Sequence, residues 1–209
     1  MSDLVIQPLM AGDAQGFAEA FAIYHAAIEL TEQRTEANLR KLLLRPDYRF
    51  FVAKRDDRII GMSVAYVPTE DYFWLFEYAA VAPEARGANI GAQLFLASRA
   101  IAGPGRFGLV EVDADRGSAE QARRLRFYQR LGCRRIGGLE YQLPLEDNGK
   151  PPEMWLLALA AEGFDALDVN IVERWLRTIY EDVYAQRLDD PRLAQMIDPL
   201  PDDVKLVAI

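Results

Sequence analysis

A bend of small residues joins an apolar strand to a helix near residue 87 of this 209-residue chain. The strand reaches Val81, and Pro83 then turns the chain, because its ring fixes φ and its nitrogen carries no hydrogen to donate. Gly87 and Gly91 allow conformations that a Cβ would block, and Asn89 tolerates the left-handed region. The helix that follows starts with unpaired amides and the positive end of its dipole. The bend therefore predicts an anion site that suits a pyrophosphate.

The competing interpretation is an ordinary strand-to-helix connection, since short loops with glycine are common. The spacing is not that of the dinucleotide-binding G-x-G-x-x-G motif, because the glycines stand at 87 and 91 with Asn89 between them. Two glycines alone do not decide between an anion site and a plain loop.

Three carboxylates lie in or at the end of apolar strands. Glu77 belongs to the strand that leads into the bend, and Glu111 and Asp113 stand at the end of the next strand. A carboxylate in such a place is costly unless it has a partner or a chemical task. Strand alternation predicts that Glu77 shares a face with Ala79 and Val81. A carboxylate that only borders the ladder or orients a substrate is the alternative for Glu77.

The bend, written Val-x-Pro-x-x-Arg-Gly-x-x-Ile-Gly, resembles the acetyl-CoA-binding signature of the GCN5-related N-acetyltransferase (GNAT) superfamily, Gln/Arg-x-x-Gly-x-Gly/Ala. Arg86 and Gly91 match its first and last positions, and Asn89 stands where the middle glycine usually lies. A second hallmark, a tyrosine ahead of a Leu-Gly-Phe-like helix end, resembles Tyr128 to Gly132, with Cys133 in place of phenylalanine. Both motifs, in this order of elements, extend the resemblance over roughly residues 1–160.

The resemblance implies an N-acetyltransferase that moves an acetyl group from acetyl-CoA to a primary amine by direct attack, with no metal. It assigns the backbone groups of Ala79, Ala80 and Val81 to the pantetheine arm, with the Val81 amide also facing the thioester carbonyl. It assigns the pyrophosphate to the residues of the bend: Arg86, Gly87, Ala88, Asn89, Ile90, Gly91 and Ala92.

Tyr128 is the general acid that the resemblance implies for the departing CoA thiolate, and aromatic packing is its alternative. The attacking amine needs a base. Glu77 is the candidate, with Glu111, Asp113 or a chain of waters as rivals. Gln121 stands where family members often carry a CoA-binding asparagine. It also closes the capping box that begins at Ser118, which is the interpretation we prefer for it.

The surrounding pattern predicts a mixed α/β sheet, because antiparallel pairs come first and strand–helix–strand crossovers follow. The expected strands are 4–9, 48–53, 59–67, 72–81, 107–112, 135–143 and 154–159. The expected helices are 14–30, 32–44, 90–102, 118–131, one beginning at a reciprocal cap of Asn170 and Glu173, and 191–197. One buried stripe is predicted on the helix from residue 90: Ile90, Leu94, Ala97 and Ile101. Another is predicted near the C-terminus: Val172, Trp175, Leu176, Ile179 and Val183.

We expect a GNAT domain over residues 1–160 and a C-terminal helical extension over 161–209, packed on that domain. The extension could instead cover a substrate or form a dimer seam. A homodimer therefore stays open, and so does a non-catalytic CoA-binding regulatory or interaction module.

The composition limits the classes of molecule that the protein is expected to bind. A net charge of −8 and a pI of about 4.8 disfavour nucleic acid and anionic lipid, and suit a cationic acceptor such as a small-molecule or protein amine. One cysteine and one histidine, Cys133 and His25, cannot form an internal disulfide or a zinc site. The sequence starts without a basic and apolar leader and has no apolar run of about 20 residues, so we expect a cytoplasmic protein.

Overall fold

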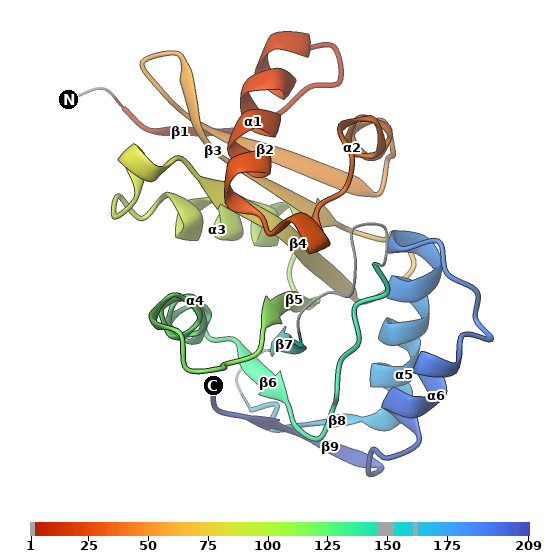
Figure 1. The fold of residues 1–209 in the computed structure, drawn as a ribbon. Coiled ribbons are helices and arrows are strands. Elements are labelled where there is room, and N and C mark those ends of the chain that lie inside the picture. The colour runs from red at the N-terminus through yellow and green to blue at the C-terminus, as the bar shows by residue number, and fades with distance from the viewer. Residues whose placement is uncertain (1–2, 146–152, 161–162) are drawn as a thin grey trace. The chain divides into compact units, whose positions relative to one another are not determined.

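The structure is a computed structural model that describes residues 3–145, 153–160 and 163–209 (Figure 1). The chain forms two compact units, which divide between Arg106 and Phe107. Each unit holds strands and helices, and the predicted mixed α/β class is confirmed. In the described part of the chain, no helix is both long and apolar enough to cross a membrane.

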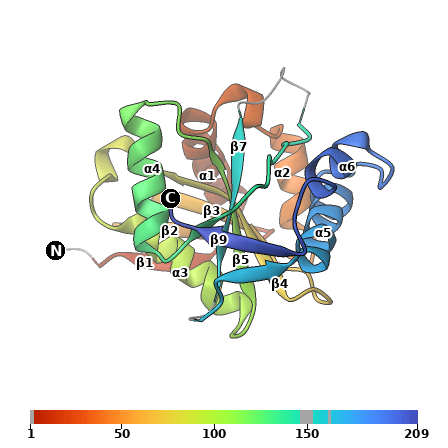
Figure 2. The same cartoon turned by 90° about the horizontal axis from the view of Figure 1, so that it is seen from below.

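The first unit has a four-stranded antiparallel sheet in the order β1-β2-β3-β4. Its strands are β1 (Val5–Pro8), β2 (Tyr48–Arg55), β3 (Arg58–Tyr66) and β4 (Phe73–Val81). Its helices are α1 (Ala14–Ala27), the short η1 (Leu30–Glu32), α2 (Glu36–Leu43), the short η2 (Pro83–Ala85) and α3 (Ile90–Ala102). Figures 1 and 2 show α1 and α2 over one face of this sheet and α3 over the other. Large apolar side chains from both faces are buried between these layers.

Local signals explain the boundaries in this unit. Asp13 caps α1 by accepting a bond from the Gly16 amide at 2.8 Å, and Thr35 caps α2 in the same way. Both helices are shorter than predicted, because the chain between them forms η1 before Thr35 starts α2 afresh. The predicted hairpin of β2 and β3 is confirmed. Its turn is only Asp56 and Asp57, both at positive φ (51° and 61°), as a two-residue turn with the right twist requires.

The predicted stripe on α3 is partly wrong. Ile90 and Leu94 are buried and Ala97 is half-buried, but Ile101 is 53% exposed. The buried face of α3 instead continues through Phe95. Apolar residues that recur every three or four positions can define two neighbouring stripes on a helix, and the structure buries the stripe that contains Phe95.

The second unit has strands in the order β5-β7-β6-β9-β8, with antiparallel pairs throughout. The strands are β5 (Phe107–Asp113), β6 (Arg134–Ile136), β7 (Met154–Leu159), β8 (Ala166–Asp168) and β9 (Asp203–Val207). The helices are α4 (Ala119–Arg130), α5 (Val169–Thr178), the π-helical turn η3 (Ile179–Val183) and α6 (Pro191–Ile197).

The C-terminal part differs from the prediction in three details. The cap of α5 is Asp168, which accepts from the Asn170 amide at 2.8 Å, and Glu173 pairs with Arg177 instead of reaching back. The strand expected over 135–143 is only the short β6. The sequence also did not predict β8 and β9, and β9 pairs with β6. The predicted apolar stripe of α5 and η3 is buried along its whole length. The domain boundary at residue 160 stays a prediction.

Candidate active site

The bend after β4 has the local conformation that its sequence predicts. The Ala82 amide donates to the Ile60 carbonyl at 2.9 Å, which holds the end of β4 against β3, and Pro83 then starts η2. Gly87 lies at φ 87° and Asn89 at φ 59°, ψ 19°, so both occupy the left-handed region. Asn89 is also the residue from which α3 begins. Residues 86–89 are exposed to solvent.

The first turn of α3 faces this exposed bend with its amides available. The Gln93 amide donates to the Asn89 carbonyl at 3.2 Å, so the amides of Ile90, Gly91 and Ala92 precede the first intrahelical bond. These groups and the helix dipole make the start of α3 electropositive. This arrangement can bind a pyrophosphate, and the guanidinium of exposed Arg86 lies on the same bend.

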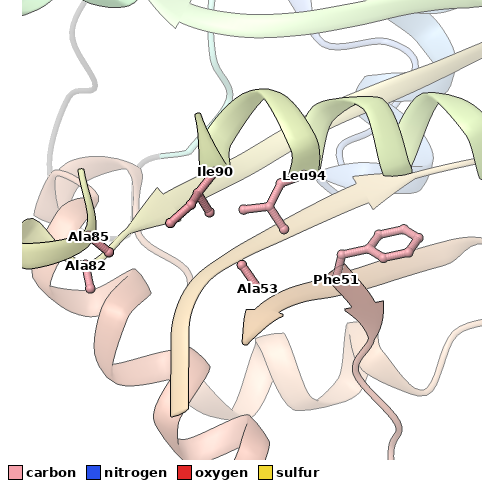
Figure 3. Packing of buried hydrophobic residues seen from close by; sticks show 6 residues of the cluster. All are labelled: Phe51, Ala53, Ala82, Ala85, Ile90 and Leu94. Carbon is pink, nitrogen blue, oxygen red and sulfur yellow. The ribbon is translucent and has the colours of Figure 1, made fainter. Parts of the chain in front are cut away.

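A small apolar cluster fixes the position of this first turn (Figure 3). Ile90 and Leu94 point from α3 onto side chains of β2 and of the bend, and the whole cluster is Phe51, Ala53, Ala82, Ala85, Ile90 and Leu94. Gly61 on β3 completes the contact, because a Cβ there would lie 3.0 Å from Ile90 Cγ2 and 3.2 Å from the Ala80 carbonyl oxygen. The start of α3 is therefore set by close packing on the sheet.

A β-bulge in β4 decides where Glu77 points. Tyr78 pairs with Val64 and Phe76 pairs with Ala65, so Glu77 is an extra residue opposite the β3 strand. The Phe76 ring contacts Phe95 of α3, whereas the Tyr78 ring contacts Tyr24 of α1. Residues two apart in a regular strand share a face, and these two do not.

The prediction that Glu77 shares a face with Ala79 and Val81 is therefore wrong. Glu77 Oε1 accepts from Arg34 Nε at 2.7 Å, on the face that α1 and α2 cover. Val81 packs against the Ile90 cluster on the face of α3. The bulge reverses the alternation, and a strand read alone gives no sign of it.

Glu77 is deeply buried, and its surroundings are aromatic. Its side chain has 0% exposure, and that of Arg34 has 10%. The Arg34 amide donates to the Tyr24 hydroxyl at 2.7 Å, and the Tyr78 hydroxyl donates to the Glu32 carbonyl at 3.0 Å. Burial raises the pKa of Tyr24 to about 12. A buried carboxylate needs a partner, and for Glu77 that partner is Arg34, which lies 43 residues away in the sequence.

Tyr128 lies in the second unit, on α4, and is buried. Burial raises the pKa of its hydroxyl, so it stays protonated at neutral pH and can donate a proton or a hydrogen bond. Arg124, one turn earlier, forms an ion pair with Asp113 Oδ2 at the end of β5. Cys133 is buried directly after Gly132, whose φ of 88° ends the helix as predicted.

Gln121 is occupied within its own loop. The Ser118 side chain accepts from the Gln121 amide at 3.0 Å, which confirms the predicted cap. The Gln121 side-chain oxygen accepts from the Arg116 amide at 3.1 Å, so the reciprocal half of the capping box is not formed.

The sequence missed a tyrosine pair around Glu111. The Tyr141 hydroxyl donates to Glu111 Oε1, and the Tyr184 hydroxyl donates to Oε2 at 2.6 Å. Tyr184 directly follows the π-helical turn η3, and Ala185 then adopts a positive φ of 53°. The only sign of this cluster in the sequence was an acidic residue in an apolar strand, and no pattern in the sequence predicts which residues bind it.

The two units hold the predicted site residues in two groups. Glu77 and residues 79–92 form one continuous segment of the first unit, and Gln121 and Tyr128 lie on α4 of the second. His25 is held by Gln33, whose side-chain oxygen lies 2.8 Å from its Nδ1. Among residues 3–145, 153–160 and 163–209, no group of three or more His, Cys, Asp or Glu side chains is placed to hold a metal ion.

Residues 46–134 match the family model described as the acetyltransferase (GNAT) domain. This stretch of the chain is similar to the GNAT acetyltransferase domain. The match includes β2, β3, β4, the bend, α3, β5 and α4, so it covers both motifs on which the resemblance rests. The resemblance to the GNAT superfamily is confirmed. No curated protein matches the chain.

Solved structures share the GNAT fold. A GNAT-family protein from Bacteroides thetaiotaomicron superposes with a TM-score of 0.71 at 22% identity, covering 88% of this chain and 99% of that one. The ribosomal-protein-S18-alanine N-acetyltransferase of Escherichia coli gives 0.59 at 14%, covering 78% and 97%. A GNAT acetyltransferase of Elizabethkingia anophelis with acetyl-CoA bound gives 0.56 at 20%, covering 77% and 100%. Such low identities establish the fold alone, and the acceptor has to be argued from the site.

Proposed function

We propose that this protein is an N-acetyltransferase that transfers the acetyl group of acetyl-CoA to a primary amine. The observation that carries the proposal is the bend after β4, where Gly87 and Asn89 adopt the left-handed region and lead into the amides that start α3. This geometry suits a pyrophosphate. A GNAT neighbour with acetyl-CoA bound supports the choice of cosubstrate.

The proposed reaction is a direct transfer. The amine nitrogen attacks the thioester carbonyl carbon, the new C–N bond forms, and the C–S bond breaks to release the CoA thiolate. Backbone groups of Ala79, Ala80 and Val81 would hold the pantetheine arm, and the Val81 amide would stabilise the oxyanion. Tyr128 would donate its proton to the departing thiolate. Burial raises the pKa of its hydroxyl, so the group is protonated before the transfer.

The proton that the amine loses would pass to Glu77. This carboxylate lies on the strand that continues into the cofactor bend, and Arg34 holds one of its oxygens. Its side chain has 0% exposure, so the acceptor would reach it through a water molecule and not by direct contact. Glu111 is the rival candidate, and tyrosine hydroxyls donate to both of its oxygens. Asp113 is paired with Arg124.

The acceptor class follows from charge. The acidic chain, with a net charge of −8, favours cationic acceptors over anionic ones. The Escherichia coli neighbour acetylates an alanine of a ribosomal protein, by its name, so a protein amine and a small amine are both within this proposal.

Calorimetric titration with acetyl-CoA tests the cofactor site. Gly87→Val places a β-branched residue at φ 87°, and we expect at least about tenfold weaker binding. Gly163→Val is the matched control, because Gly163 has φ 89° and the same open surroundings but lies outside the bend. Absence of binding by the wild-type protein, or equal binding by the two variants, would overturn the assignment.

Turnover with an amine library tests the chemistry. Glu77→Gln is expected to lower kcat by about 100-fold or more, with KM for acetyl-CoA unchanged. Tyr128→Phe is expected to lower kcat by a smaller factor, because a thiolate leaves readily. Tight acetyl-CoA binding without turnover of any amine would support a CoA-binding regulatory module instead.

A further inference from the structure

A group of buried polar side chains lies on the sheet face of the first unit that α1 and α2 cover. These side chains come from distant parts of the chain. Tyr48 begins β2 and pairs with Tyr66, which places it on the same face as Val64 and Tyr78. The bulge turns Glu77 to that face too. Tyr48 is 5% exposed and the Glu77 side chain is fully buried.

Two polar atoms of this group are unsatisfied. Within the part of the chain that the structure describes, Glu77 Oε2 and Tyr48 Oη are buried and have no hydrogen-bond partner. Glu77 uses only Oε1 for Arg34, and Tyr48 makes its polar contact through the ring, which lies under the Arg45 guanidinium at 4.9 Å. Buried polar atoms without a partner are rare, because each loses its hydration without gaining a hydrogen bond in return.

The register places the two side chains on the same face of the sheet, on the two strands that flank β3. Burial is the main cause of the raised pKa of Tyr48, and the negative charge of Glu77 is the next. A hydroxyl can donate or accept, and a carboxylate oxygen can only accept. A molecule that accepts from Tyr48 and donates to Glu77 would satisfy both, and water has these properties.

We propose that one internal water bridges Tyr48 Oη and Glu77 Oε2, and that Tyr48 is thereby a positioning residue for Glu77. The proposal rests on the proposed function for its catalytic consequence, since Glu77 is the suggested base. Arg34 fixes Oε1, and the water and Tyr48 fix Oε2. The carboxylate is thus held from both sides in one orientation, without an exposed contact of its own.

A double-mutant cycle on thermal stability tests the bridge without any assay of activity. Tyr48→Phe removes the hydroxyl and leaves the ring. A dry, orphaned hydroxyl would make this change stabilising, because a desolvation cost disappears. The bridge predicts the opposite sign, a Tm lower by about 2–4 °C. In a Glu77→Gln background, which can still accept from Arg34, this loss should shrink to less than half.

Tyr180→Phe is the matched control. Tyr180 is also buried, and its hydroxyl donates to the Gln142 carbonyl at 2.6 Å in the second unit. It should lower Tm by a similar amount in both backgrounds, because it has no part in the bridge. A higher Tm for Tyr48→Phe, or the same loss with and without Glu77→Gln, would overturn the bridge.

Kinetics test the positioning role. We expect Tyr48→Phe to lower kcat about tenfold while KM for acetyl-CoA stays unchanged, because a carboxylate that is only misplaced loses part of its effect. If the stability cycle shows the expected coupling but kcat of Tyr48→Phe is unchanged, the positioning role is overturned and only the bridging water is supported. A wild-type protein that binds acetyl-CoA but turns over no amine would fail the proposed function, and the stability cycle would still decide the bridge.

Discussion

Gly61 lies on β3 against the first turn of α3, and this contact allows a quantitative test of how the cofactor bend is positioned. A Cβ added at Gly61 would lie 3.0 Å from Ile90 Cγ2, 3.2 Å from the Ala80 carbonyl oxygen and 3.4 Å from Leu94 Cδ1. The first two distances are shorter than an ordinary van der Waals contact. The Ala80 oxygen cannot withdraw without disturbing the pairing of β3 with β4. Ile90 must therefore move, and with it the start of α3.

Gly61→Ala is expected to cost about 1–3 kcal/mol, the usual penalty for one extra methyl group in a packed core. For a chain of this size, that is a fall in Tm of about 2–12 °C. Acetyl-CoA binding should weaken as well, because Ile90 carries the first amide of the helix. Differential scanning fluorimetry and calorimetric titration measure the two effects.

Two further variants identify the cause. Ile90→Leu removes the Cγ2 methyl that stands 3.0 Å from the added atom, so Gly61→Ala in that background should lose much less stability than in the wild type. Gly12→Ala is the control, because a Cβ there meets nothing within 4 Å. A Gly61→Ala protein with the Tm and affinity of the wild type would refute the argument that this contact positions α3.

Alkaline pH should destabilise the fold. Burial raises the pKa of four tyrosines above the ordinary value of 10: Tyr24, to about 12, and Tyr48, Tyr128 and Tyr180. Their contribution to stability is complete below pH 10 and is lost as pH rises from there toward the folded values, because only the unfolded chain releases these protons easily. Tm should fall over that window, with tyrosinate absorbance rising together with unfolding. Full tyrosinate absorbance in the folded protein near pH 10 would contradict the burial argument. Tyr184→Phe, which deletes the 2.6 Å bond to Glu111, should lower Tm by about 3–12 °C, whereas the same change at Tyr72, which is 74% exposed, should shift it by less than about 1 °C. Equal shifts at the two positions would mean that the Glu111 cluster adds no stability.

The comparison of sequence and structure separates local from distant determinants. The caps at Asp13 and Ser118, the hairpin of β2 and β3, and the left-handed Asn89 follow from residues within a few positions of one another. Backbone preferences act over this range, so the pattern of the sequence was sufficient to predict them. The cofactor bend belongs to this class, because the residues that shape it are neighbours in the chain.

The partners and directions of the carboxylates belong to the other class. The bulge that turns Glu77 toward Arg34 exists only because two strands pair with unequal numbers of residues, and one strand read alone cannot show it. The tyrosines on Glu111 come from segments 30 and 73 residues away. The β9 strand is stabilised by pairing with β6, not by a strong pattern of its own. The sequence by itself determined the strands of the first unit, the approximate places of the helices and the bend that suits a cofactor. Only the tertiary structure decided which way each buried charge points, because that depends on register and packing between segments far apart in the chain.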